Sequence, residues 1–168
     1  MESIICNLVG YINEQMPELS MVDEDYGQLE NLEDENRDMY PITFPAVLIE
    51  NTETEWSGIA GRSQKGDALF RVRLIIDCYD DTHAGCGTRF AVQEREEMRS
   101  KLHSILQGYR PFNDGILIRK RSKYFTWYHG IKVYEMIYAC VVTECFTETT
   151  RRLWFLSANF EPGKAGLS

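Results

Sequence analysis

The chain has 168 residues, of which 43% are apolar and 26% are charged. This balance is typical of one globular domain and not of a disordered or low-complexity chain. The longest unbroken apolar run, residues 136–142, is far shorter than the roughly 20 residues that cross a bilayer. The N-terminus lacks a basic region and a small-residue cleavage site, so we expect a cytoplasmic protein without a signal peptide. Five cysteines without a Cys-x-x-Cys pair predict reduced thiols.

The net charge of −8 is divided unevenly along the chain. Residues 1–60 hold 14 acidic residues and one basic residue, whereas residues 61–168 hold 12 acidic and 17 basic residues. An acidic first third disfavours wrapping around nucleic acid. Opposite charge blocks suit self-association in which one surface meets a different surface of the next copy. The alternative is that the two halves fold together and their charges cancel locally.

The first part of the chain predicts a helix, an acidic arm and the start of a sheet. Apolar residues recur at helical spacing over residues 2–16 until Pro17. Residues 18–40 are rich in carboxylates and poor in apolar residues, which is typical of an exposed loop or arm without an ordered core element. The alternative for this segment is light docking through Tyr26, Leu29 and Leu32. Residues 44–50 form a short apolar run that predicts a buried strand. Residues 54–59 predict another strand or one arm of a hairpin.

Residues 68–79 give the clearest strand pattern. Phe70, Val72 and Leu74 alternate with Arg71 and Arg73, which predicts that both arginines point outward. A turn over residues 80–88 leads into a second helix over residues 89–107, closed by Gly108. A strand then begins at residues 116–118 and runs into a basic segment, and residues 124–128 and 131–146 predict one or two more strands.

This order of elements predicts an α+β fold: a mainly antiparallel sheet with an N-terminal helix and a second long helix packed on one face. We expect one domain over residues 1–160, with the acidic loop or arm at about residues 18–40. Residues 161–168 are expected to form a flexible tail.

The densest group of possible metal ligands follows the clearest strand. Its spacing matches no metal motif, and Asp80-Asp81-Thr82 before a helix is ordinary turn and cap chemistry. A metal-dependent hydrolase that uses Asp77, Asp80 and His83 is therefore a minor alternative. The chain has no Gly-x-Ser-x-Gly elbow and no P-loop, and we expect no catalytic residue, cofactor or metal. The group consists of Asp77, Cys78, Asp80, Asp81, His83 and Cys86.

A basic run, Arg119, Lys120, Arg121 and Lys123, is followed by the aromatic-rich segment 124–128. This pairing occurs in proteins that bind single-stranded nucleic acid, and a small nucleic-acid-binding or regulatory module is the main alternative function. It is equally typical of an edge strand, where positive charge discourages unwanted pairing. We prefer a third interpretation, in which the basic run meets acidic residues of a neighbouring copy or a partner. The acidic interface candidates are Asp23, Glu24, Asp25, Glu33, Asp34 and Glu35.

The layout from residue 1 to residue 146 resembles that of the tail terminator, or tail completion, proteins of long-tailed bacteriophages and prophages and their neck-region relatives. The resemblance rests on the order of elements: the opening helix ending in Met16-Pro17-Glu18-Leu19, the strand at residues 44–49, the strand ending at residues 75–79, the long helix, and the closing strand at residues 134–138.

This resemblance implies a structural, non-enzymatic subunit of the virion tail. Such a subunit forms a homo-oligomeric ring, commonly a hexamer, that caps the tail tube and provides the surface for head-tail joining. The implied partners are the tail tube protein and head-neck proteins. The resemblance brings no small-molecule substrate, cofactor or membrane, and no nucleic acid except DNA passing through the ring. The acidic segment departs from the simplest members of that family.

Overall fold

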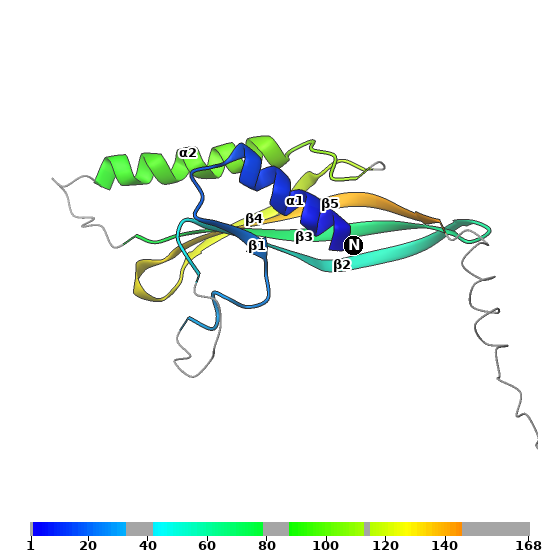
Figure 1. Cartoon of the computed structure of the whole chain (residues 1–168), viewed down its shortest axis with the longest axis horizontal. Coiled ribbons are helices and arrows are strands. Elements are labelled where there is room, and N and C mark those ends of the chain that lie inside the picture. Colours follow the sequence, from blue (N-terminus) through cyan, green and yellow to red (C-terminus); the bar gives the residue numbers. More distant parts are fainter. Residues whose placement is uncertain (1, 33–41, 79–87, 113–114, 146–168) are drawn as a thin grey trace, which may run out of the picture.

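A computed structural model of the chain describes residues 2–32, 42–78, 88–112 and 115–145, which form two helices and a five-stranded sheet (Figure 1). The strand order is β1-β2-β3-β5-β4; β1 runs parallel to β2, and the other neighbours are antiparallel. The predicted α+β fold is confirmed. In chain order the elements are α1 (Glu2–Gln15), β1 (Met21–Glu24), β2 (Ala46–Ala60), β3 (Ser63–Ile76), α2 (Thr88–Leu106), β4 (Ile118–Thr126), a 3-10 turn (Tyr128–Gly130) and β5 (Lys132–Cys145).

Both helices lie on the same side of the sheet, which we call the helix face (Figure 1). The apolar residues of α1 recur every three or four positions and therefore point toward the sheet. The second helix ends where Gly108 adopts a φ of +82° and donates its N–H to the carbonyl of Leu117 at 2.8 Å. The main core on this face includes Leu8, Ile12, Phe70, Val72, Leu102, Leu106, Met136 and Tyr138.

Part of the acidic segment is ordered against the sheet, so the prediction of an exposed arm is wrong for residues 18–32. Residues 21–24 form β1, which pairs with residues 46–49 of β2. Leu29 is fully buried in a second apolar cluster with Leu48 and Ile75. This cluster lies on the side of the sheet away from the helices, which we call the opposite face. Apolar burial and ion pairs with arginines offset the cost of ordering an acidic segment.

Arg73 is buried, which corrects the prediction that both arginines of β3 point into solvent. Phe70 and Val72 do lie in the core of the helix face, and Arg73 lies on the opposite face as the alternation requires. Alternation predicts the face of the sheet on which a side chain lies, but it does not predict whether another segment of the chain covers that face. Here the segment around Asp25 and Glu30 covers it, and the Arg73 side chain is only 3% exposed.

Two pairs of predicted segments prove to be single strands. Residues 46–60 form the continuous strand β2, with a bulge that leaves Thr52 as an extra residue between Asn51 and Glu53. Residues 118–126 likewise form the single strand β4, in which Lys120 is the extra residue. The basic run and the first aromatic residues therefore lie on one strand.

The far half of the sheet extends beyond α1 as a part without helical cover (Figure 1). We call it the distal sheet; it comprises residues 53–67 of β2 and β3 with residues 140–145 of β5. Trp56 lies over Gly66 there, because a Cβ placed on Gly66 would come within 2.9 Å of the side chains of Thr54, Trp56 and Val142. The aromatic side chain thus occupies the space that the glycine leaves free.

Several predicted features lie outside the described residues. They are the turn over residues 80–87, the interface candidates Glu33, Asp34 and Glu35, and the tail from residue 161. These features and the domain boundary stay predictions.

Candidate assembly interface

The basic run lies on β4, which is an edge strand of the sheet. Lys120, Arg121 and Lys123 are exposed, and Arg119 is half-buried with its backbone N–H donated to Gln107 Oε1 at 3.1 Å. Within the described ranges, none of these four side chains forms an ion pair. The strand therefore presents uncompensated positive charge along an open edge.

The hydrogen bonds of the β4–β5 hairpin show which backbone groups of β4 face outward. Trp127 donates its N–H to the carbonyl of Ile131 at 2.7 Å. In an antiparallel pair, hydrogen-bonded and non-hydrogen-bonded positions alternate. Trp127 is a hydrogen-bonded position, so the positions one, three and five residues before it are not hydrogen-bonded to β5. These positions are Thr126, Tyr124 and Ser122, and their N–H and C=O groups point toward the open edge. These three residues offer a template for another strand.

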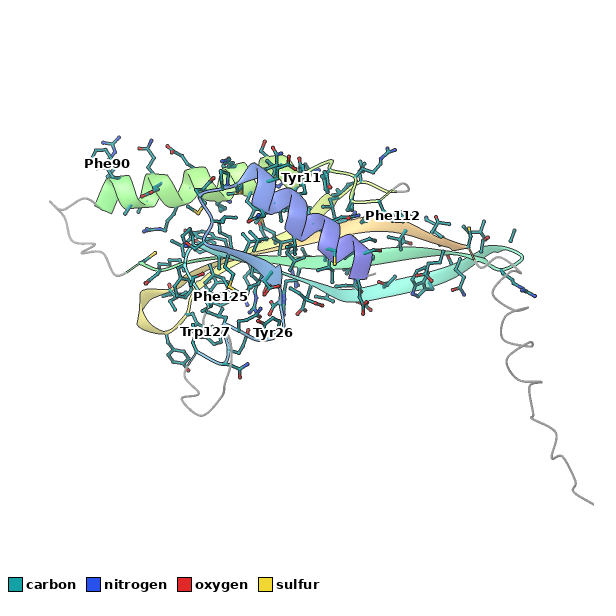
Figure 2. All side chains as sticks on the ribbon, viewed as in Figure 1. Tyr11, Tyr26, Phe90, Phe112, Phe125 and Trp127 are labelled. Atoms are coloured by element: carbon teal, nitrogen blue, oxygen red, sulfur yellow. The ribbon has the colours of Figure 1, made fainter. Side chains whose placement is uncertain are left out.

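The aromatic residues beside the basic run are divided between the core and the surface. Phe125 and Trp127 pack against the second apolar cluster, and Figure 2 shows both on the side of the sheet away from the helices. The Lys123 ammonium lies 5.0 Å from the centre of the Phe125 ring. Tyr124 and Tyr128 are 80% and 61% exposed. Only these two aromatic rings of the segment are exposed, and each also contacts another ring, Tyr134 for Tyr124 and Trp127 for Tyr128, which weakens the nucleic-acid interpretation.

Asp25 is not available as an interface residue, contrary to the sequence prediction. Its side chain is 2% exposed, and its Oδ2 lies 2.5 Å from Arg73 Nη2 and 3.7 Å from Arg71 Nη2. Glu30 also binds Arg73, and this hydrogen bond lowers the pKa of the Glu30 carboxyl. Glu18 binds Lys101 on α2. The alternative of local cancellation between the two charge halves therefore holds for these acidic residues.

The other edge of the sheet carries the acidic residues that remain. Asp23 and Glu24 lie on β1, with Glu24 exposed. Beyond β1, the outer side of β2 from residue 51 to residue 60 has no neighbouring strand among the described residues. Glu53 and Glu55 are exposed on this open stretch. The sequence analysis missed both, although the spacing Glu-Thr-Glu within a strand places two carboxylates on one face.

The predicted metal-ligand group is described only at its first two members. Asp77 and Cys78 line an open cleft of about 630 Å³ between α2 and the strand ends, together with Glu18, Phe44 and Met98. In the ranges that the structure covers, no three potential ligands come together as a metal site. The other members of the group, Asp80, Asp81, His83 and Cys86, lie outside these ranges. The hydrolase alternative stays a prediction.

His103 lies on α2, and its ring has a structural role because its polar partner belongs to the core. Its Nδ1 lies 2.9 Å from the hydroxyl of Tyr138, a residue fully buried in the main core. Burial lowers the pKa of His103, and the charges of Arg119 and Arg99 lower it further. Burial also raises the pKa of Tyr138 to about 12.

No helix in the described part of the chain has the length and apolar character needed to cross a membrane.

Comparisons with known proteins leave the family open. No family model matches the sequence, and no curated protein matches it. A similar chain occurs in the solved structure of the virion of a native gene transfer agent particle. The two chains are 12% identical, with a TM-score of 0.42, over 83% of this chain and 84% of the other. A similarity of this strength carries no conclusion about the fold, function or partners of this protein.

Proposed function

We propose that this protein is a structural, non-enzymatic subunit of a phage or prophage tail, of the tail terminator or completion type. It forms a ring that caps the tail tube and joins it to the head, and its partners are the tube protein and the head-neck proteins. It uses no cofactor or metal. The resemblance in element order suggests this role, and the two oppositely charged edges of one sheet support it.

The observation that carries the proposal is the separation of charge across the sheet. The basic residues of β4 occupy one edge, and Glu24, Glu53 and Glu55 occupy the other. A contact between unlike edges is heterologous, because each copy offers one edge to its neighbour and keeps the other free. Repetition of such a contact closes into a ring when the rotation between copies allows it. Opposite charges also guide the copies into this orientation.

Light scattering coupled to size-exclusion chromatography tests the proposal directly. At low salt we expect a species of several subunits, which negative-stain electron microscopy would show as a ring with a central channel. The species should dissociate as salt rises, because exposed charges are screened. A strict monomer at all concentrations and at both salt levels would overturn the proposal.

A charge reversal on β4 tests the surface. Lys120→Glu combined with Arg121→Glu should weaken self-association while leaving the unfolding midpoint nearly unchanged, because both side chains are exposed. Arg89→Glu combined with Arg95→Glu is the matched control, with the same charge change on α2. An equal loss of assembly in both variants would point to net charge and not to β4. Salt-sensitive binding of single-stranded oligonucleotides, lost only in the β4 variant, would instead favour the nucleic-acid alternative.

A further inference from the structure

We propose that neighbouring copies join by strand addition, with β4 of one copy pairing along the open stretch of β2 in the next. This inference rests on the proposed self-association and adds the contact that makes it. The sheet would then continue from subunit to subunit, with the helices of all copies on one side. The partner is a second copy of this chain, and the contact is made by backbone hydrogen bonds with flanking ion pairs.

Both edges have the chemistry that strand addition requires. Ser122, Tyr124 and Thr126 direct their backbone groups outward from β4, as the hairpin register shows. On β2, the parallel partner β1 ends at Glu24, opposite Ile49. Neither stretch contains proline, the residue that blocks a ladder by lacking an N–H. The regular parts of the two edges, from Glu53 to Gly58 on β2 and from Arg121 to Thr126 on β4, can therefore pair with another strand, and the bulges at Thr52 and Lys120 bound them.

The direction of the strands suits an antiparallel contact. Each neighbouring pair from β2 through β3 and β5 to β4 is antiparallel, so β2 and β4 run in opposite directions. When two copies stand side by side with their helices on the same side, β4 of one is therefore antiparallel to β2 of the next. Antiparallel pairing is slightly more stable per residue than parallel pairing.

The charges match in spacing and in face. Arg121 and Lys123 pair with residues 137 and 135 of β5, which alternate with the core residues Met136 and Tyr138 and so lie on the opposite face. Glu53 and Glu55 pair with residues 69 and 67 of β3, which alternate with Ala68 and Phe70 and lie on the same opposite face. Two bases and two acids, each two residues apart, thus come together on one side of the joined sheet.

The level of the two charge pairs defines how far the copies are displaced along the strands. Through the register, Ser122 is level with residue 72 of β3, whereas Thr54 is level with residue 68. The difference of four residues is the displacement between neighbouring copies, about 14 Å along the strands. Each copy adds four strands, β2 to β5, to the width of the joined sheet, which is about 19 Å. This ratio gives a strand tilt of about 36°, which lies within the range of closed barrels.

The same displacement leaves room for β1. Moved by four residues, Ile118 of the incoming strand comes level with Ser57 of β2, and Thr126 comes level with Ile49. Ile49 is the position where β1 ends. Asp25, the residue after β1, donates its N–H to the carbonyl of Ile49 at 2.8 Å, so this level of the edge is already occupied. The incoming β4 would therefore pair with β2 beyond the end of this contact, through residues that precede Thr126. The truncated length of β1 is what keeps the rest of the edge open.

Charge complementation tests which edges meet. One variant carries Arg121→Glu and Lys123→Glu, and a second carries Glu53→Lys and Glu55→Lys. Each variant alone should lose assembly, because its two edges then have the same charge sign. An equimolar mixture should restore assembly, since each β4 again finds a β2 of opposite charge. A mixture that stays as dissociated as its components, while the wild type assembles, overturns the strand addition and leaves the ring proposal standing.

A proline at an outward position tests the backbone ladder. Ser122→Pro removes an N–H that points away from β5, so the β4–β5 hairpin should stay intact. We expect self-association to weaken roughly tenfold, while Ser122→Ala, which keeps the N–H, assembles like the wild type. Circular dichroism and the unfolding midpoint establish that Ser122→Pro folds; if it does not, charge complementation decides. Unchanged assembly of a folded Ser122→Pro variant contradicts the proposal, and a wild type that never associates overturns both proposals.

Discussion

The carboxylate of Asp25 and the guanidinium of Arg73 meet on the opposite face of the sheet, where Oδ2 and Nη2 are 2.5 Å apart. Both side chains are almost fully buried, and Glu30 completes the cluster. The acidic segment is thereby attached to the central strand of the sheet by a charge pair that water does not screen.

Removal of Arg73 should destabilise the fold strongly. Arg73→Met leaves the buried Asp25 with the longer ion-pair contact to Arg71 and the N–H of Gly27 at 3.2 Å, and breaking a buried pair typically costs about 3–5 kcal/mol. Urea unfolding followed by circular dichroism measures the loss. Arg71→Met is the matched control on the same strand, with a more exposed side chain and a smaller expected cost. Equal losses in the two variants would contradict the role of Arg73.

The lowered pKa of Glu30 predicts a loss of stability in acid. The hydrogen bond from Arg73 keeps the folded-state pKa below the ordinary value of 4.5, so the native state binds fewer protons than the unfolded state. The stabilisation is present above that value and is lost as the pH falls through the folded-state pKa. Because Glu30 is partly exposed, we expect a contribution below about 1 kcal/mol.

Glu30→Gln should therefore flatten the decline of the unfolding midpoint as the solution is acidified below about pH 5. Glu14→Gln is the control, because Glu14 is exposed on α1, away from the proposed interface, and forms no ion pair within the described ranges. Parallel curves for wild type and Glu30→Gln would mean that this carboxylate does not stabilise the folded state.

His103 should make stability depend on pH nearer neutrality. Burial lowers its pKa, so the unfolded state takes up a proton more readily than the native state. The contribution of neutral His103 to stability is therefore fully present above pH 6.5, the ordinary pKa of histidine, and is lost as the pH falls below this value toward the folded-state pKa. Unfolding midpoints measured from about pH 7.5 to about pH 5.5 should decline in the wild type and less in His103→Gln. Identical slopes would exclude His103 as the source.

Two glycines should respond in opposite ways to alanine. A Cβ on Gly115 would lie 2.3 Å from the carbonyl oxygen of Val141 and 2.7 Å from its nitrogen, so the backbone must move. Gly115→Ala should cost about 1–3 kcal/mol. Gly10 lies on α1 with no atom in the way, and Gly10→Ala should stabilise by up to about 1 kcal/mol. Thermal unfolding measures the change in midpoint for both variants. An unchanged midpoint in Gly115→Ala would show that the backbone at Val141 moves at little cost.

Local periodicity was sufficient to predict the elements that carry most of the main core. The helix with Leu8 and Ile12 and the strand with Phe70 and Val72 repeat their apolar residues over several turns or alternations, so few other structures fit them. The burial of Arg73 and the order of the acidic segment did not follow, because both depend on contacts between distant residues: 25 positions apart for the pairing of β1 with β2, and 43 for the bond between Arg73 and Glu30.

The candidate interface was predicted on its basic side and, on its acidic side, only at Asp23 and Glu24 of β1. The bases from Arg119 to Lys123 are adjacent in sequence and stand out as a run. The place of Glu53 and Glu55 in the candidate interface follows from the strand order, because β1 ends at Glu24 and leaves the rest of the β2 edge without a neighbouring strand among the described residues. An open edge is a property of the assembled sheet and has no local sequence pattern.

The bulge at Thr52 also decides which face each side chain from Glu53 to Gly58 lies on, up to the second register shift between Gly58 and Ala60. Counted from Val47 by simple alternation, Glu53 and Glu55 would fall on the helix face, and Trp56 would fall on the other side from Gly66. The extra residue shifts this count by one and restores the match. Deletion of one residue in this stretch, such as Thr52, would close the bulge and keep Trp56 level with Gly66, whereas deletion of two residues would turn the following side chains over. The spacing of this strand is thus as strongly constrained as its composition.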